Sequence, residues 1–125
     1  MARWIVVTNR THESRPLARA RWCDSFACRL RGLSLRRRLN QGEGLLLVEA
    51  RPSRLGAAIH MAGMLFPLGI VWIGPDQRVV DLVRARPWRI YWPGAPAIYT
   101  LEASPDILDS VAAGDHVEFI DEPQG

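Results

Sequence analysis

The chain of 125 residues contains no lysine, and all sixteen of its basic residues are arginine. It also has no apolar run approaching the roughly 20 residues that a helix needs to cross a bilayer. Residues 1–9 lack the basic start, apolar stretch and small-residue cleavage site of a secretory signal peptide. These absences argue against a membrane span and against export, and we expect a cytoplasmic protein.

Motifs that carry familiar chemistry are missing as well. We find no glycine-rich phosphate loop, no strand-turn-helix motif around a nucleophilic serine and no helical His-Glu metal motif. The three histidines and two cysteines show no metal-ligand spacing. The sequence therefore predicts neither a metal site nor a cofactor, and no motif in it identifies a catalytic residue.

The only two cysteines, Cys23 and Cys28, stand five residues apart in a segment that we predict to be helical. Side chains five apart on a helix point about 140° away from each other. That geometry prevents a disulfide bond, so we expect two packed free thiols.

What is present is an ordinary globular composition, with 48% apolar and 23% charged residues. A chain of this length can bury one core without disulfides or metals. We expect a single domain over residues 1–121, followed by a flexible tail at residues 122–125.

The charges are unevenly distributed along the chain. Residues 1–54 hold twelve arginines against four acidic residues, whereas residues 55–125 hold four arginines against nine acidic residues. If the two halves form different faces, the molecule has a strong dipole.

Short apolar or alternating runs predict strands, with connections of hairpin length between them. The turn at residues 74–77 should join two strands as an antiparallel hairpin. Crossover helices are missing, which favours a compact antiparallel sandwich or partly open barrel of about seven strands with two short helices. The expected strands cover residues 4–8, 17–22, 45–48, 59–60, 69–73, 79–83, 97–102 and 115–120.

Both predicted helices are bounded by recognisable end residues. Asp24 is the expected N-cap of the first, and Gly32 its expected end. Ser104 and Pro105 provide a cap and a first-turn proline for the second, which Gly114 should end. A polar segment with Arg36, Arg37 and Arg38 follows the first helix, and residues 87–96 are expected to be a loop.

The most apolar stretch spans residues 59–73. Pro67 prevents a regular helix through its middle, because proline lacks the amide donor and clashes with the preceding turn. We therefore predict a short strand at residues 59–60, an apolar link, and a buried strand at residues 69–73.

Several short motifs follow one another in a characteristic order along the chain. They are Arg31-Gly32-Leu33, residues 42–47, residues 59–64, residues 66–68, Arg78-Val79-Val80, Leu101-Glu102 and Gly114-Asp115. In this order they resemble domain of unknown function family 192, which is bacterial and archaeal. The resemblance spans about residues 4–119 and implies a compact, mostly β domain, with no assigned activity. The family usually has an aspartate where this chain has Gly69, and a basic residue where it has Leu65.

The link at residues 61–66 and the aromatic loop at residues 88–92 could together line a small-ligand cleft. The alternative is that these aromatic and methionine side chains plug the end of a small barrel. The expected ligand-binding residues are His60, Met64, Phe66, Trp88, Trp92, Glu102 and Arg31.

Three functions remain open at this level. The first is a non-enzymatic binding or accessory module for a small molecule. The second is an enzyme that uses His60 and Glu102 as an acid/base pair. The third is a weak nucleic-acid or polyanion binder through the arginine-rich half, although charge runs more often form solvated faces.

Overall fold

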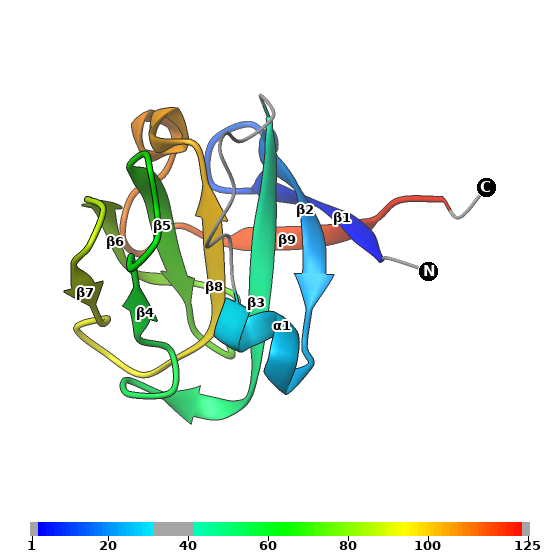
Figure 1. The fold of residues 1–125 in the computed structure, drawn as a ribbon. Coiled ribbons are helices and arrows are strands. Elements are labelled where there is room, and N and C mark those ends of the chain that lie inside the picture. The colour runs from blue at the N-terminus through cyan, green and yellow to red at the C-terminus, as the bar shows by residue number, and fades with distance from the viewer. Residues whose placement is uncertain (1–2, 32–41, 124–125) are drawn as a thin grey trace.

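The computed structural model describes residues 3–31 and 42–123, with the backbone alone for Phe26, Leu30 and Arg31. Its described part contains nine strands and two short helices (Figure 1). In chain order these are β1 (Trp4–Asn9), β2 (Arg15–Cys23), α1 (Phe26–Arg31), β3 (Glu43–Ser53), β4 (Ile59–His60), β5 (Leu68–Ile73), β6 (Val79–Ala85), β7 (Ile90–Tyr91), β8 (Ala97–Ala103), the 3-10 helix η1 (Pro105–Ser110) and β9 (Val117–Asp121).

Seven of these strands form one curled sheet in the order β6-β5-β8-β3-β2-β1-β9, and β4 pairs with β7 in a small second sheet. The predicted mainly-β fold is confirmed, in its partly open barrel form. One neighbouring pair departs from the expected antiparallel pattern, because β2 and β3 run parallel. The connection between them includes α1. It brings the chain back to the end of the sheet at which β2 began, because two parallel neighbouring strands must start at the same end.

The two edges of the curled sheet meet at one end. An isolated antiparallel bridge joins Arg78 to His116. Beside it, Val79 N donates to the carbonyl oxygen of Asp115 at 2.9 Å, and Val117 N donates to that of Gln77 at 2.9 Å. These contacts bring β6 close to β9, so the sheet is almost a closed barrel.

The barrel interior is filled by apolar side chains from all seven strands. Ile5, Val7 and Val117 come from β1 and β9, and Ile107 of η1 and Val111 just after it cover the end. The remaining buried members are Leu17, Ala18, Ala20, Leu46, Val71, Ile73, Val79, Leu101 and Ala103.

A second core lies on the outer side of β3, β5 and β8, beneath the small sheet. Figure 1 shows β4 and β7 on the left, set apart from β1, β2 and β9 on the right. Met61 and Met64 are buried in this layer, at 0% and 2% exposure. Trp72 is buried there too, and its indole N–H donates to the carbonyl oxygen of Ala57 at 2.8 Å. The layer therefore anchors the small sheet to the barrel.

The expected hairpin around residues 74–77 is confirmed, with β5 and β6 antiparallel. Gln77 N donates to Gly74 O at 3.0 Å, and Gln77 itself takes a left-handed φ of 65°. A turn closed by one left-handed residue is a common way to join two strands. The prediction of a plain loop at residues 87–96 was wrong, because β7 forms there and pairs with β4.

The first helix has a different N-cap from the expected one, whereas the second begins at Pro105 as predicted but ends earlier. Ser25, rather than Asp24, caps α1, and its hydroxyl accepts a hydrogen bond from Cys28 N at 3.1 Å. The second helix is a 3-10 helix that ends at Ser110, and Ser104 makes no side-chain capping bond. No helix within residues 3–31 and 42–123 is long and apolar enough to cross a membrane. Gly32 and Arg36–Arg38 lie outside the described residues.

The two cysteines form a disulfide bond, which overturns the expectation of free thiols. Their Cα atoms are 5.7 Å apart. The prediction placed both residues on one helix, but Cys23 is the last residue of β2 and α1 begins only at Phe26. The turn between strand and helix brings the two side chains together.

The uneven charge of the two halves is compensated by their pairing in the sheet. Because β1 lies beside β9, arginines of the first half meet acidic residues of the second. Arg3 pairs with Asp121 at 2.7 Å, and Arg10 pairs with Glu118 at 2.6 Å. Glu122 of the expected tail pairs with Arg19 at 2.8 Å.

Candidate functional site

Three of the predicted site residues lie in or beside the small sheet and are exposed. His60 lies opposite Ile90, and Ile59 lies opposite Tyr91. Ile59 and Tyr91 belong to the second core, so His60 and Ile90 face outward. Trp88 and Trp92 stand two residues before and after Ile90, and they are 72% and 54% exposed.

Backbone hydrogen bonds hold this arrangement. Met61 N donates to Arg89 O at 2.7 Å, and Trp88 N donates to Met61 O at 2.8 Å. The second bond fixes Trp88 in a left-handed conformation with a φ of 67°, an unusual state for a bulky side chain. The exposed aromatic rings thus do not plug the barrel.

Three other predicted residues lie inward. Met64 is 2% exposed, and Phe66 packs partly buried against the same second core. Glu102 is 4% exposed and lies on β8 between Leu45 of β3 and Ile70 of β5. The side chain of Arg31 is outside the described part.

A cavity of about 310 Å³ adjoins His60. We call it the His60 cavity. Its walls come from α1, β3, β4, β8 and the segment before β4. They are formed by Arg29, Leu47, Glu49, Gly56, Ala57, Ala58, His60 and Thr100.

Arg29 is held in a defined position in this wall. Its Nη1 donates to the carbonyl oxygens of Asp24 at 2.7 Å and of Val48 at 3.1 Å. Its Nε lies 3.6 Å from Glu49 Oε2, in an ion pair whose two side chains are 24% and 18% exposed. A guanidinium fixed by three oxygens loses little freedom when a ligand binds beside it.

Glu102 stands two residues beyond Thr100 on the same face of β8. Thr100 lines the cavity and is 1% exposed. The Glu102 Oε1 atom is buried and has no hydrogen-bond partner among the described residues. Burial raises the pKa of this carboxyl to about 7, because the charged form is cut off from water.

Glu102 itself is not among the residues that line the His60 cavity; its neighbour on the same face of the strand, Thr100, is. A buried carboxyl without a partner is rare in folded proteins, since leaving it unpaired costs stability. No described hydrogen bond or ion pair joins Glu102 to His60, so the structure gives the acid/base pair no contact of its own.

Sequence reasoning missed three members of the site, namely Arg29, Glu49 and Thr100. Arg29 was not among the predicted ligand-binding residues. Its pairing with Glu49 depends on α1 packing across β3, which no local pattern reveals. Thr100 could have been found, because alternation along β8 places it on the same face as Glu102.

The fold and site define a curled half-barrel with a small second sheet and a buried carboxyl whose Oε1 atom has no partner in the part of the chain that the structure describes. A family model described as "Uncharacterized ACR", DUF192, matches residues 6–119. The chain belongs to this family, as the order of its motifs indicated.

Archaeal relatives agree with this assignment. A UPF0127 protein from Thermococcus sibiricus is 34% identical over 116 residues, which cover 91% of this chain and 74% of the relative. A UPF0127 protein from Thermococcus kodakarensis is 30% identical, again over 91% of this chain and 73% of the relative. The family remains one of unknown function.

Two crystal structures share the fold. A protein of unknown function from Novosphingobium aromaticivorans superposes with a TM-score of 0.78 at 24% identity, covering 92% of this chain and 83% of that one. A protein from Sinorhizobium meliloti gives a TM-score of 0.78 at 21% identity, covering 95% and 94%. At these identities the likeness concerns the architecture alone.

Proposed function

We propose that this chain is a non-enzymatic binding module that holds a small molecule at the His60 cavity, with a donor group of the ligand directed to Glu102. The observation that carries the proposal is the buried Oε1 atom of Glu102, which has no partner among the described residues. A ligand N–H or O–H group would supply the missing hydrogen bond.

The polar side chains that line the His60 cavity favour a ligand with both hydrogen-bonding and apolar groups. Arg29 and Glu49 offer a fixed donor and a fixed acceptor side by side. His60 adds a ring that is exposed at the cavity edge. Small-ligand sites commonly combine a few such oriented polar groups with apolar walls.

The exposed aromatic residues support an apolar extension of the ligand. Because His60 and Ile90 are cross-strand partners, the cavity edge continues onto the side that carries Trp88 and Trp92. Large apolar residues exposed together are typical of binding surfaces. We therefore expect a ligand with a cationic or amide donor at one end and an aromatic or alkyl group at the other.

A thermal-shift experiment with the full chain tests this proposal. The probes are benzamidine, phenethylamine and benzamide, with benzoate as an anion that lacks a donor. A bound probe at a hundredfold excess over its Kd stabilises the fold by about 2.7 kcal/mol. We expect at least one donor probe to raise the Tm, and benzoate to leave it unchanged.

Two variants and one control locate the binding. Glu102→Gln and His60→Ala should abolish the probe-dependent shift, whereas Glu118→Gln on β9, outside the His60 cavity, should keep it. A shift of equal size in wild type and in Glu102→Gln would rule out this site. The absence of any shift with all three donor probes would count against the ligand class.

The proposal also includes the cytoplasmic location expected from the sequence. Disulfide bonds are rare in that compartment. The Cys23–Cys28 bond should therefore be reduced in the cell. Alkylation of thiols at the moment of lysis, followed by mass spectrometry, tests this, and a disulfide-linked peptide would indicate an oxidising compartment instead.

A further inference from the structure

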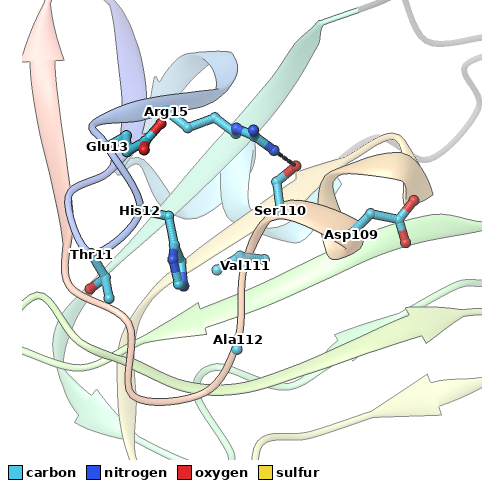
Figure 2. A pocket seen from close by; sticks show the side chains of 8 residues that line it. All are labelled: Thr11, His12, Glu13, Arg15, Asp109, Ser110, Val111 and Ala112. Atoms are coloured by element: carbon cyan, nitrogen blue, oxygen red, sulfur yellow. Dashed lines mark hydrogen bonds between the residues drawn. The ribbon is translucent and has the colours of Figure 1, made fainter.

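A second cavity, of about 640 Å³, lies between the β1–β2 connection and the segment that includes the end of η1 (Figure 2). We call it the His12 cavity. It shares no residue with the His60 cavity. Its lining residues are Thr11, His12, Glu13, Arg15, Asp109, Ser110, Val111 and Ala112.

The side chain of buried Asn9 holds the two sides of the His12 cavity together through three hydrogen bonds. Asn9 is 0% exposed, and its side-chain N–H groups donate to Ser110 O at 3.0 Å and to Asp115 Oδ2 at 2.8 Å. The Asn9 Oδ1 atom accepts a hydrogen bond from Thr11 N at 3.0 Å. This one side chain ties the β1–β2 connection to the segment after η1 and fixes the cavity width.

Asp115 provides a buried negative charge behind the cavity. It is 6% exposed, and its Oδ2 also accepts a hydrogen bond from Ala112 N at 2.9 Å. Burial alone would raise the pKa of Asp115, but the bonds from Asn9 and Ala112 and the nearby His12 together lower it. The carboxylate therefore stays ionised at neutral pH.

His12 stands between this carboxylate and the cavity. Its Nε2 lies 3.5 Å from Asp115 Oδ2, and its side chain is 62% exposed. An ionised carboxylate beside an imidazole can accept a hydrogen bond from it, which orients the ring. The Nδ1 atom has no hydrogen-bond partner among the described residues, so it is free to contact a ligand.

Arg15 follows His12 in the same turn and also lines the cavity. Figure 2 shows its side chain extending across the cavity to Ser110, where Nη1 donates to the hydroxyl at 3.4 Å. No described carboxylate forms an ion pair with Arg15. In the same view Asp109 points away from His12. A guanidinium and an imidazole thus face one space, with a hydroxyl beside them.

The turn that presents these two residues is strained. Arg15 N donates to His12 O at 3.2 Å, and the two central residues, Glu13 and Ser14, have φ values of 58° and 54°. Two left-handed residues in a row are the pattern of a type I′ turn, which normally uses Asn and Gly. Residues held in such strained backbone conformations are frequent at functional sites, where the surrounding structure stabilises them.

From this geometry we infer that the His12 cavity binds the oxyanion of a small ligand, a carboxylate or a phosphate, between the Arg15 guanidinium and the His12 ring. Arginine binds such oxygens with two parallel hydrogen bonds. The Ser110 hydroxyl adds a third donor. The site is independent of the ligand proposed for the His60 cavity.

The test is a titration of the ¹⁵N-labelled full chain, followed by NMR, with inorganic phosphate in one arm and sodium acetate in the other at constant ionic strength. We expect saturable shifts of the Thr11, His12 and Ala112 amides. Arg15→Gln and His12→Gln should each weaken binding by about tenfold, the loss of one charge-assisted contact. Arg15→Lys should lose less, because it keeps the charge.

Arg51→Gln is the matched control, since Arg51 is an exposed arginine of β3 that lines neither cavity. It should bind like the wild type. Shifts that grow linearly without saturation, or equal affinity in wild type and Arg15→Gln, overturn the inference. The arm with the tighter binding distinguishes a phosphate ligand from a carboxylate ligand.

Discussion

A side chain at Gly69 would collide with Ser104, because a Cβ atom at that position would lie 2.9 Å from the Ser104 carbonyl oxygen. Pro105 Cα and Ile107 Cγ1 would be 3.2 and 3.1 Å away. The missing aspartate of the family pattern is therefore explained by packing, since η1 lies directly against β5 here. Position 69 faces η1, whereas Glu102 lies on the opposite face of the sheet with Ile70.

We expect Gly69→Ala to destabilise the fold by about 1–3 kcal/mol, the usual cost of overpacking a core. Gly69→Asp should cost more, because it also buries a charge. Urea denaturation measures both. Gly94→Ala is the control, since a Cβ there would meet only the end of the Asp81 side chain at 3.3 Å. Equal stability of Gly69→Ala and wild type would show that η1 moves freely.

The buried Glu102 carboxyl predicts a pH-dependent stability. Its pKa rises from 4.5 to about 7 on folding, so the folded chain keeps a proton that the unfolded chain releases. Stability should fall as pH rises from about 4.5 to 7, by a total of about 3 kcal/mol, and stay level above that range.

Glu102→Gln removes this titration and should flatten the stability curve between pH 5 and pH 8. Denaturant midpoints across that range provide the measurement, with Glu118→Gln on β9 as the control. If the wild type and Glu102→Gln change in parallel, another group causes the pH dependence.

The Cys23–Cys28 disulfide closes a short loop at the junction of β2 and α1. A crosslink over about six residues stabilises a fold by about 2 kcal/mol through the unfolded chain. Reduction, or Cys23→Ser with Cys28→Ser, should lower the free energy of unfolding by that amount. Chemical denaturation with and without reductant checks this, and the double variant should not respond to the reductant.

The strained turn at the His12 cavity predicts a stabilising substitution. Ser14→Gly should raise stability by about 0.5–1 kcal/mol, because glycine accepts a left-handed φ without steric cost. Ala50→Gly in β3 is the control and should lower stability by a similar amount, since glycine weakens a strand. A loss of stability in Ser14→Gly would mean that the serine side chain stabilises the turn.

Local patterns predicted most of the strands, because the residue pattern that favours a strand lies within a single short segment. Pro67 separates β4 from β5, and the turn at Gly74 joins β5 to β6, just as the residue types require. The same logic misplaced Cys23. It extended the helix backwards past Ser25, whose hydroxyl caps α1, and so it excluded a disulfide that the strand-to-helix turn permits.

The candidate sites were only partly predictable. His60 and Glu102 stood out as polar residues in apolar stretches, yet Arg29 and Glu49 meet only because α1 packs across β3. The His12 cavity was missed entirely. Its members are separated by about a hundred residues along the chain, and the β1–β9 pairing brings them together.

The sequence by itself determined most of the strands, the hairpin turn at residues 74–77 and the mainly-β class, because alternation, proline and glycine act through local backbone geometry. Only the tertiary structure decided which charges meet. Arg3 and Arg10 of the arginine-rich first half form ion pairs with Asp121 and Glu118, because β1 lies beside β9. Near the end of β8, the Oε1 atom of Glu102 is buried without a partner among the described residues, because the neighbouring strands exclude water from it.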